Sequence, residues 1–340
     1  MAATLKNIAK KSGYSVTTVS RALNGHSDVN EETRRKIEQV ARELNYFPNR
    51  MAQQLVTRKT NVIGLYSLDR QTFQNQFIHL MISGMMDEAT RHNFNLLLFA
   101  TQHLQTAEEM EVQCRARGLG GAVIAGLRTD EPLLNDLAQT DFPLVLIDLP
   151  VMGPKTTFVS VDNVQGAKKA VDHLAGLGHR SIGFVNGHSQ AWVSQERLAG
   201  YRQGMLENGL QVETSYIFEG DFSKESGRQG AKRLLEANPN LTAIFAASDL
   251  MAVGVLEQLQ SMNVVVPNQI SVIGFDDQDF TTHVTPALST VRQDMYSFGT
   301  VAAKELIAMM EDEAYVPKHE DLASVLVPRG STGPVCTSES

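Results

Sequence analysis

The stretch TLKNIAKKSGYSVTTVSRALN, residues 4–24, limits what the chain can fold into more than any other, because it predicts two short helices joined by a tight turn. Leu5 and Ile8 begin an apolar face with helical spacing. Gly13 can take the left-handed conformation that commonly ends a helix, and the Ser15 hydroxyl can cap the next helix. The pattern predicts a helix-turn-helix, whose second helix lies in the major groove of DNA. An ordinary helical hairpin is the alternative.

The charge distribution favours DNA binding over a plain hairpin. Residues 1–60 contain 11 Lys or Arg and 5 Asp or Glu, a net charge of +6, whereas the whole chain carries −8. Residues 61–340 therefore carry −14. A basic module on an acidic body is expected of a protein that contacts phosphates at one end only. The length of 340 residues also suggests two or three domains.

Two further helical segments follow this motif. Asn30 can cap a helix over residues 31–45, whose apolar stripe would complete a three-helix core. Pro48 suits the first position of another helix, and the seven residues after it are good helix formers. A helix this short is marginal alone, because isolated helices below ~12 residues rarely persist in water. We therefore expect contacts outside the segment to stabilise it.

These motifs resemble the DNA-binding head and hinge of the LacI/GalR (lactose-repressor) family of bacterial transcription regulators. The similarity is dense over residues 4–65, which include LNYFPNRMAQQL after the helix-turn-helix, and looser to about residue 333. It implies a hinge helix that folds only on DNA, paired with its dimer mate in the minor groove. Leu55 would be a wedge between base steps, with Ala52 and Gln53 beside it. A plain linker with a buried leucine is the alternative.

The same resemblance implies how DNA would be read. The first residues of the second helix would contact base edges: Thr17 can bond a base or meet a thymine methyl, and Val16 offers only apolar contact. Arg21 could bond guanine or phosphate. The side chains that would position the protein on the DNA backbone are Thr4, Ser15, Thr18, Ser20, Asn24, Tyr46 and Asn49. Many relatives carry a polar or aromatic residue at position 16, so the operator sequence stays open.

From residue 61 the chain alternates between apolar runs and helical patterns. Runs such as NVIGLYSL (61–68) and SIGFVN (181–186), separated by helical crossovers, are typical of parallel strands buried on both faces. We expect an α-helical helix-turn-helix head and an α/β body of two doubly wound parallel-sheet subdomains, which by resemblance are similar to type I periplasmic binding proteins. The predicted parts are a helix-turn-helix domain (1–47), a hinge helix and linker (48–60), an N-terminal ligand-binding subdomain (61–161 and 292–320), a C-terminal one (162–291 and 321–333) and a tail (334–340).

Polar residues at the ends of the predicted strands are the candidates for a small-molecule site, because open α/β sheets bind ligands beyond the carboxyl ends of their strands. Each alone could instead be a cap or a solvated loop residue. The candidates at strand ends are Asp69, Arg70, Gln102, Arg128, Asp148, Asn186, His188, Ser248 and Asp276. Arg197 lies one turn into the predicted helix after His188, and Gln293 lies beside a crossing between the subdomains. Ser248 stands where many sugar-binding relatives have Asn. Asp249 is expected to cap the helix after it.

Three of these candidates, Asp148, Arg197 and Asp276, fall by resemblance where family members hold hydroxyls or polar ring atoms of a small effector. Carboxylates and a guanidinium suit vicinal hydroxyls, because each can make two hydrogen bonds in fixed geometry. Trp192, the only tryptophan, and Phe222 could stack on the apolar face of a sugar. Phe222 could equally be a core residue.

Signals for other protein classes are absent from the sequence. No secretory apolar region opens the chain and no run of ~18 apolar residues occurs, so we expect a cytoplasmic protein. Cys114 and Cys336 have no metal-ligand spacing, and we expect free thiols, no metal site and no cofactor. The tail lacks apolar heptads, which favours a homodimer. Its interface, unless they are ordinary core residues, would include Met81, Met85, Met86, Leu256 and Leu259.

The sequence as a whole predicts a sequence-specific DNA-binding transcriptional regulator, with a repressor of a carbohydrate-utilisation operon as the favoured form. Its dimer would bind a pseudo-palindromic operator under the control of a small effector, for which we expect a sugar. A purine- or nucleoside-type corepressor is the alternative, sandwiched by Phe73, Phe77 or Phe222. A solute-binding protein would need an export signal in place of the basic head. An enzyme would need a phosphate-binding or nucleophile motif, and the sequence has none.

Overall fold

The computed structural model of the chain describes residues 3–23, 28–46, 60–67, 76–100 and 106–335. The chain forms two compact units, a head over residues 1–60 and a body over residues 61–340. Each unit has its own hydrophobic core.

Local caps fix where the helices of the head begin and end. These helices are α1 (Leu5–Ser12), α2 (Val16–Leu23) and α3 (Glu31–Glu43). The Thr4 hydroxyl accepts a hydrogen bond from the Asn7 amide, and the Asn7 side chain accepts one from the Thr4 amide. Gly13 ends α1 with a φ of 80°. The Ser15 hydroxyl then accepts from the Thr18 amide at 3.0 Å, so the first turn of α2 is capped as the sequence predicts.

The three helices of the head pack around a small apolar core. Ile8, Val19 and Ile37, one from each helix, are fully buried at its centre. The predicted helix-turn-helix and its third helix are therefore confirmed. The third helix ends at Glu43, before the predicted Asn45, because Asn45 turns to a positive φ of 49°.

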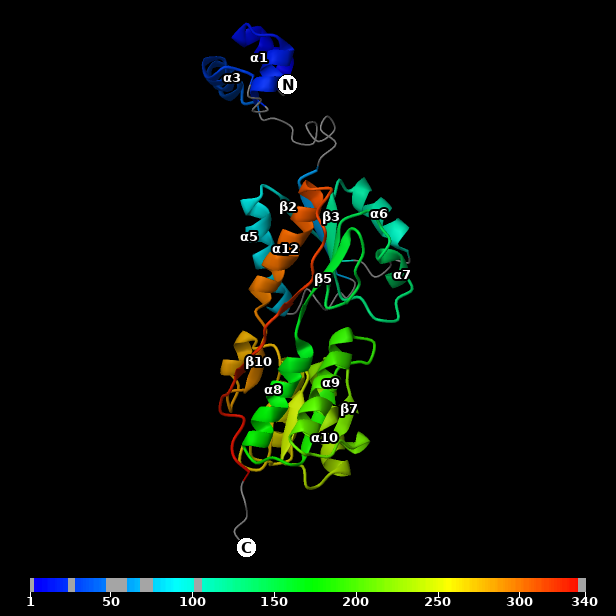
Figure 1. The fold of residues 1–340 in the computed structure, drawn as a ribbon. Helices are drawn as coiled ribbons and strands as arrows, with labels where there is room; N and C mark the ends of the chain where they lie inside the picture. Colours follow the sequence, from blue (N-terminus) through cyan, green and yellow to red (C-terminus); the bar gives the residue numbers. More distant parts are fainter. Residues whose placement is uncertain (1–2, 24–27, 47–59, 68–75, 101–105, 336–340) are drawn as a thin grey trace. The chain divides into compact units, whose positions relative to one another are not determined.

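The first lobe of the body is a six-stranded, all-parallel sheet with strand order β11-β5-β4-β3-β1-β2. Helices α5 and α12 lie side by side on one face, and α6 and α7 lie on the other (Figure 1). The strands are β1 (Val62–Ser67), β2 (Asn95–Ala100), β3 (Gly121–Ala125), β4 (Leu144–Ile147), β5 (Thr156–Val161) and β11 (Glu320–Leu322). The helices are α5 (Gln76–Arg91), α6 (Ala107–Ala116), α7 (Leu134–Leu137) and α12 (Met295–Glu311).

The second lobe is a four-stranded parallel sheet with order β7-β6-β8-β9, beside a two-stranded antiparallel ladder of β10 and β12. Its strands are β6 (Ile182–Asn186), β7 (Ile217–Glu219), β8 (Ala243–Ala246), β9 (Ser271–Ile273), β10 (Thr290–Arg292) and β12 (Val325–Val327). Its helices are α8 (Asn163–Gly176), α9 (Trp192–Glu207), α10 (Lys224–Ala237) and α11 (Asp249–Ser261), with short 3-10 turns η2 (Thr214–Tyr216) and η3 (Asp279–Thr282).

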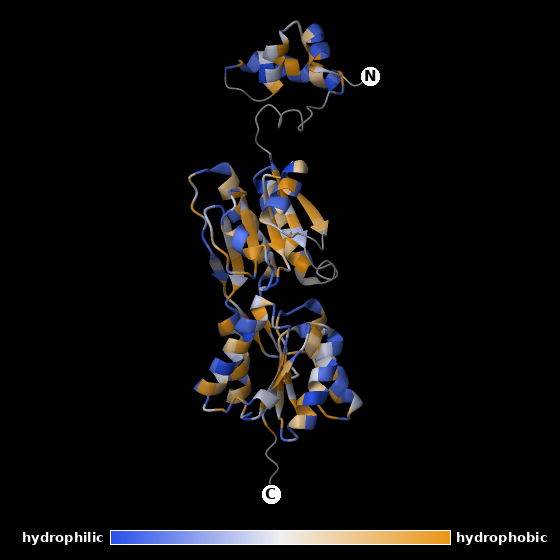
Figure 2. Ribbon diagram, turned by 90° about the vertical axis from the view of Figure 1, so that its right-hand side faces the viewer, coloured by the Kyte–Doolittle hydropathy of each residue, from blue (hydrophilic) through white to orange (hydrophobic). Residues whose placement is uncertain are grey.

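The apolar runs of the sequence become the buried strands of both sheets, and the helices turn their hydrophilic faces outward (Figure 2). The two predicted doubly wound parallel sheets are thus confirmed. The run ASVLVP at 323–328 does form a strand of the second lobe, β12. It does not join the four-stranded sheet, because it pairs antiparallel with β10. The chain crosses between the lobes three times, between β5 and α8, β10 and α12, and β11 and β12.

Glycines allow paired helices to approach at backbone distance. A Cβ atom on Gly299 of α12 would lie 1.9 Å from the Met81 carbonyl oxygen of α5. On the opposite helix, a Cβ atom on Gly84 would lie 2.0 Å from the Tyr296 carbonyl oxygen. Both distances are far below van der Waals contact, so the crossing of α5 and α12 has no room for any side chain at either position.

Four of the five residues predicted for a dimer interface are core residues. Met81, Met85 and Leu259 are fully buried within their own lobes, and Leu256 is 9% exposed. The interface prediction is therefore wrong for these four residues. Helical spacing shows that they share one apolar face of a helix, but it does not show whether that face packs in the core of the lobe or against a second subunit. Met86 is 53% exposed and remains a candidate for the dimer interface.

Cys114 is a free, buried thiol, as expected, whereas Cys336 lies outside the described residues. Among the helices in the described ranges, none is long and apolar enough to cross a membrane.

Replacing Gly299 with alanine should destabilise the body by about 1–3 kcal/mol or more, because the new methyl group must push α5 and α12 apart. The matched control is Gly176→Ala, at the end of α8, where an added Cβ meets nothing within 4 Å. That control should be neutral or stabilising by up to ~1 kcal/mol. Urea unfolding of both variants measures the difference, and equal stability of the two would contradict the packing argument.

Candidate functional site

The outward face of α2 is the candidate nucleic-acid interface of the head. Its first turn contains no acidic residue. Val16 is 41% exposed and Thr17 beside it is exposed as well. Short side chains at the start of an exposed helix allow a close approach to base-pair edges in the major groove. This face can therefore make apolar and hydroxyl contacts with bases.

Arg21, in the last turn of α2, is held by an acidic partner that the sequence did not suggest. Its guanidinium forms a two-point ion pair with Asp28, with 2.6 Å between Nη2 and Oδ2 and 3.2 Å between Nε and Oδ1. The two side chains are 47% and 54% exposed. A fork of this kind fixes the orientation of the guanidinium, while its other N–H groups can still reach a base or phosphate. Asp28 thus positions a predicted DNA contact.

Some of the other residues predicted to contact DNA already form hydrogen bonds within the head. The Thr4 hydroxyl donates to Asn7 Oδ1 at 2.5 Å, and the Ser15 and Thr18 hydroxyls share a hydrogen bond of 2.8 Å. Ser20 and Tyr46 are half-buried. The predicted DNA contacts that lie outside the described residues are Asn24, Asn49, Ala52, Gln53 and Leu55.

A buried polar cluster forms where the strand ends of both lobes meet. Asp148 follows β4 of the first lobe, whereas Arg197 of α9 and Asp276 after β9 belong to the second. Asn163 opens α8 and Gln293 follows β10. The polar cluster is defined here as Asp148, Asn163, Arg197, Asp276 and Gln293. The sequence predicted four of the five; Asn163 was missed, although its position just after the apolar run FVSV is itself a strand-end signal.

Arg197 is the cation at the centre of the polar cluster. It is 3% exposed, and its Nε donates to Asn163 Oδ1 at 2.8 Å. Its Nη1 donates to the Ala247 carbonyl at 2.5 Å and lies 3.9 Å from Asp276 Oδ1. The guanidinium also stacks 3.9 Å above the ring centre of Phe275. These contacts satisfy a charge that burial would otherwise make very costly.

Both carboxylates of the polar cluster sit on strained backbone. Asp148 has a φ of 55° and Asp276 a φ of 120°, in a region that residues with a side chain rarely occupy. Such strain is concentrated at ligand sites, where the surrounding structure holds it in place. The Ser160 hydroxyl donates to Asp148 Oδ1 at 3.0 Å, and Gln293 Nε2 donates to Asp276 Oδ1 at 2.6 Å.

Burial dominates the protonation of these carboxyl groups. It raises the pKa of Asp148 to about 6, against the opposing pull of Arg197, and Asp276 adds repulsion. It likewise raises the pKa of Asp276 to about 6, again opposed by Arg197. The pKa of Glu196, one residue before Arg197, is also raised by burial and by nearby carboxylates that include Asp148. Among the residues of this site that the structure describes, carboxyl groups therefore outnumber the guanidinium of Arg197.

A second contact joins the lobes through the loop after β3. The Thr129 amide donates to the Gln190 carbonyl at 2.8 Å, and the Thr129 hydroxyl donates to the same oxygen at 3.1 Å. Gln195 Nε2 donates to the Thr129 hydroxyl at 3.3 Å. The predicted site residue Arg128 precedes Thr129 in this loop. Its Nε lies 3.4 Å from Asp130 Oδ1, and its side chain is about half exposed.

The predicted aromatic residues are engaged in packing. Trp192 opens α9 of the second lobe, yet it packs against the first-lobe core that contains Leu127 and Leu149. The Phe222 ring packs on the second-lobe core and lies edge-on to the His188 ring, with 5.6 Å between the ring centroids. Burial lowers the pKa of His188, so this imidazole is neutral at pH 7. Trp192 is thus a direct reporter of how the lobes are arranged.

Ser248 and Asp249 have roles that differ from the predicted ones. The Ser248 hydroxyl caps α11 by accepting from the Met251 amide at 3.3 Å. Asp249 is the first helical residue and does not cap, so that prediction is wrong. Its fully buried carboxylate instead accepts from the Thr290 hydroxyl at 2.6 Å and from the Gln278 amide at 2.9 Å.

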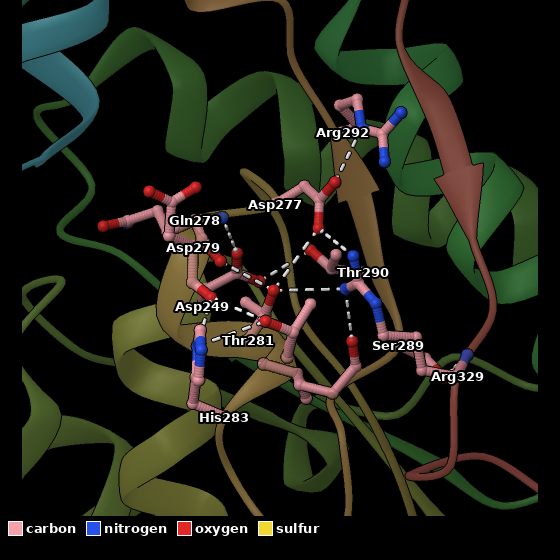
Figure 3. A network of polar contacts seen from close by, with 12 residues as sticks. Asp249, Asp277, Gln278, Asp279, Thr281, His283, Ser289, Thr290, Arg292 and Arg329 are labelled. Atoms are coloured by element: carbon pink, nitrogen blue, oxygen red, sulfur yellow. Dashed lines mark hydrogen bonds and ion pairs between the residues drawn. The ribbon is translucent and has the colours of Figure 1, made fainter.

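A network of polar contacts around η3 continues from Asp249 to the C-terminal segment (Figure 3). Asp277 Oδ1 and Oδ2 accept from Arg329 Nη2 at 2.5 Å and Arg292 Nε at 2.6 Å. Arg329 Nη1 also donates to the Leu288 carbonyl at 2.7 Å. These ion pairs tie the C-terminal segment to the loop that carries Asp276.

The predicted site residues Asp69, Arg70 and Gln102 lie outside the described part of the chain. Within that part, no group of three or more His, Cys, Asp or Glu side chains could hold a metal ion.

Comparisons with known proteins identify a DNA-binding domain in the head and a binding-protein-like domain in the body. Bacterial regulatory proteins of the lacI family match residues 4–49, and a periplasmic binding protein-like domain matches residues 171–332. Catabolite control protein A of Priestia megaterium is 32% identical over 315 residues, which are 92% of this chain and 94% of that protein. A Lac repressor dimer bound to operator and the anti-inducer ONPF superposes with a TM-score of 0.84 at 27% identity, covering 98% of this chain and 100% of that one. The complex of the transcriptional regulator CelR with cellobiose has a TM-score of 0.73 at 28% identity, covering 97% and 99%.

Replacing Asp148 with asparagine should stabilise the unliganded protein at pH 7.5. The folded-state pKa of about 6 lies above the usual 3.8, so the folded protein binds this proton more tightly and loses stability as the pH rises through 6. The loss is at most about 3 kcal/mol, and an amide avoids it. Denaturant unfolding should show a gain at pH 7.5 that shrinks by about 2 kcal/mol at pH 4.5. The exposed control Asp141→Asn should show no such trend; a variant no more stable than wild type at pH 7.5 would contradict the assignment.

Proposed function

The chain belongs to the lacI family of bacterial regulatory proteins, and we propose that a sugar held between its two lobes controls its binding to operator DNA. It is a helix-turn-helix transcriptional regulator, and its relatives are regulators rather than enzymes. The observation that carries the proposal is the polar cluster, to which the first lobe contributes Asp148 and the second contributes Arg197 and Asp276. A ligand bound there touches both lobes.

A sugar suits this cluster chemically. Its hydroxyls donate and accept hydrogen bonds in fixed geometry, which carboxylates and amides can match in pairs. The solved relative CelR is a complex with cellobiose, which supports a carbohydrate as the ligand class. We propose that the chain represses a carbohydrate-utilisation operon, in the cytoplasm, where operator DNA is found.

Effector control follows from the position of the cluster between lobes. A ligand that bonds Asp148 and Asp276 together favours one arrangement of the two lobes over others. We propose that residues 48–60 form a hinge helix whose pairing in a dimer depends on the arrangement of the first lobes. Because a helix that short is marginal alone, a small shift is enough to change operator affinity.

For DNA, we propose that α2 lies in the major groove, with Val16 and Thr17 at base edges and Arg21 oriented by Asp28. The proposed backbone contacts are Thr4, Ser15, Thr18, Ser20, Asn24, Tyr46 and Asn49. Leu55, with Ala52 and Gln53, would wedge into the minor groove and kink the duplex. The net charge of +6 over residues 1–60 supports these contacts.

We further propose a homodimer that binds a pseudo-palindromic operator. In the first lobe, β2 is an edge strand on which Leu97 and Leu98 are 41% and 48% exposed, and Val112 on α6 is 61% exposed. Exposed leucines on a sheet edge are an aggregation liability unless a partner covers them. The Lac repressor relative is a dimer on its operator, which supports a second copy as that partner.

The purine alternative lacks a comparable observation. A nucleobase needs aromatic faces on both sides, whereas the Phe222 ring is packed on the second-lobe core and against His188. The side chains of Phe73 and Phe77 lie outside the described residues. The described residues therefore favour the sugar.

Leu55→Ala should weaken specific operator binding by about 10- to 100-fold, because an apolar wedge contributes only where the duplex is kinked. Binding to random DNA should change little, since phosphate contacts provide it. Titration of both DNAs by fluorescence anisotropy measures the two affinities. Leu206→Ala, a 68% exposed leucine of the body, is the control. An equal loss on both DNAs would rule out a wedge.

A panel of neutral mono- and disaccharides tests the effector directly. A sugar present at ~100 times its dissociation constant should add about 2.7 kcal/mol of apparent stability. The same sugar should change both operator affinity and the emission of Trp192, which packs across the lobes. By reciprocity, operator DNA must change sugar affinity by the same factor. If no member of the panel alters operator binding, the proposal of sugar control fails.

A further inference from the structure

We propose that Asp28 is a specificity-determining residue of the head: it presents Arg21 to a guanine edge and keeps the guanidinium away from the phosphates. The inference rests on the proposed docking of α2 in the major groove, because it names the base that one residue of this helix reads and the residue that enforces the choice. Asp28 lies outside α2, seven residues after Arg21, and is not among the DNA contacts that the sequence predicts.

Arg21 lies on the exposed face of α2. Thr17 and Arg21 are one helical turn apart, and both are exposed. Val19 and Ala22 point the other way and are buried in the core of the head. When Thr17 lies at a base edge, Arg21 therefore lies over the same groove, about 6 Å further along the helix axis.

The position of Asp28 is fixed by the two residues that follow it. Val29 packs against the apolar core of the head, and the Asn30 side chain caps α3 by accepting from the Thr33 amide at 2.7 Å. The backbone that carries the carboxylate is thus anchored to both the core and a helix start. Asp28 is therefore a fixed partner for an arginine side chain that would otherwise sample many rotamers.

The ion pair uses one particular edge of the guanidinium. Arg21 Nε and Nη2 face the two carboxylate oxygens at 3.2 and 2.6 Å. The edge formed by Nη1 and the second N–H of Nη2 is not part of this pair, and it can donate two parallel hydrogen bonds to O6 and N7 of guanine. The other three bases do not present two such acceptors side by side in the major groove. Asp28 thus leaves Arg21 a donor edge that matches guanine.

The charge of Asp28 also disfavours a phosphate contact by Arg21. A phosphate brings negative charge beside the carboxylate, so the two anions repel each other and compete for the same guanidinium. A base edge carries no net charge, and its acceptors can bond the guanidinium while the ion pair stays intact. The pair therefore favours reading of a base over anchoring to the backbone.

Stability is a weak reason for this ion pair. Both side chains are about half exposed, and an ion pair this exposed contributes little to the free energy of unfolding. Variants of Asp28 should therefore keep the fold of the head, and their DNA binding reports on recognition.

Selection from random duplex DNA by the full-length protein identifies the operator, and titration of single-base variants of that operator identifies the position that Arg21→Ala no longer discriminates. Wild type should prefer guanine there, with about 5- to 150-fold weaker binding of the other base pairs. A different preferred base, or discrimination that Arg21→Ala leaves unchanged at every position, overturns the inference. A selection that yields no consensus defeats sequence-specific binding itself, and the inference with it.

Asp28→Asn is the isosteric test, read by fluorescence anisotropy on the operator and on random DNA. Guanine discrimination should fall at least about 5-fold, since the fork that orients Arg21 is lost. Affinity for random DNA should stay or rise, because a negative charge near the phosphates is removed. The matched control Glu31→Gln removes the same charge from another exposed ion pair of the head, with Arg35 at 3.6 Å, and should leave discrimination unchanged. Unaltered discrimination in Asp28→Asn contradicts the proposal, as does an equal loss of affinity on both DNAs.

A double variant shows whether Asp28 acts through Arg21. Asp28→Asn should weaken operator binding in wild type, yet it should no longer do so when Arg21 is alanine, because the two residues work as one unit. The same weakening in both backgrounds would rule out positioning of Arg21. These measurements need no effector, so this inference can fail while sugar control stands, and sugar control can fail while this inference stands.

Discussion

The buried guanidinium of Arg197 is the interaction around which the body is organised. It lies where the strands of both lobes end, and it donates hydrogen bonds to Asn163 at the start of α8 and to the carbonyl that follows β8. It also forms an ion pair with Asp276 in the loop that follows β9. A buried charge is tolerated only when its partners are fully arranged, so these elements are fixed relative to one another. Asp148 of the first lobe interacts electrostatically with the same guanidinium. Two separately folded sheets thereby share one electrostatic centre.

Among the residues that the structure describes, the contacts between the lobes include several polar ones, whereas each lobe is held together by its own close-packed apolar core. Within the first lobe, the glycines of α5 and α12 permit backbone contact. Between the lobes, the contacts include hydrogen bonds of Thr129, the packing of Trp192 and the polar cluster. A rigid interior with an adjustable interface is the physical requirement for a protein whose lobes respond to a small ligand.

In the head, the residues proposed to function lie on the surface and not in a buried cluster. Its core is small, with one fully buried aliphatic residue from each of three helices, and its surface carries most of its functional chemistry. The ion pair of Arg21 with Asp28 orients a cation before DNA is met, which reduces the side-chain entropy lost on binding. Basic charge favours the approach of the head to DNA, and in the proposed complex the fixed geometry of α2 determines which base edges it can touch.

The sequence by itself determined the secondary structure, the class of the fold and the strand-end positions of most of the site. Helical and strand periodicity, caps such as Thr4 and Ser15, and the turn at Gly13 are local properties that neighbouring residues fix. The same logic placed Asp148 and Asp276 at strand ends, since parallel strands gather those ends at one edge of the sheet. Arg197 lies within a helix, and its place in the site was predicted through the family resemblance. Only the tertiary structure decided the pairings: Arg21 with Asp28, Asp249 with Thr290 rather than with its own helix, β12 with β10, and the burial of Met81 and Met85. Apart from the nearby pair in the head, these contacts join residues far apart in the chain. Which partner or which face wins depends on how helices and sheets pack, and no local pattern contains that information.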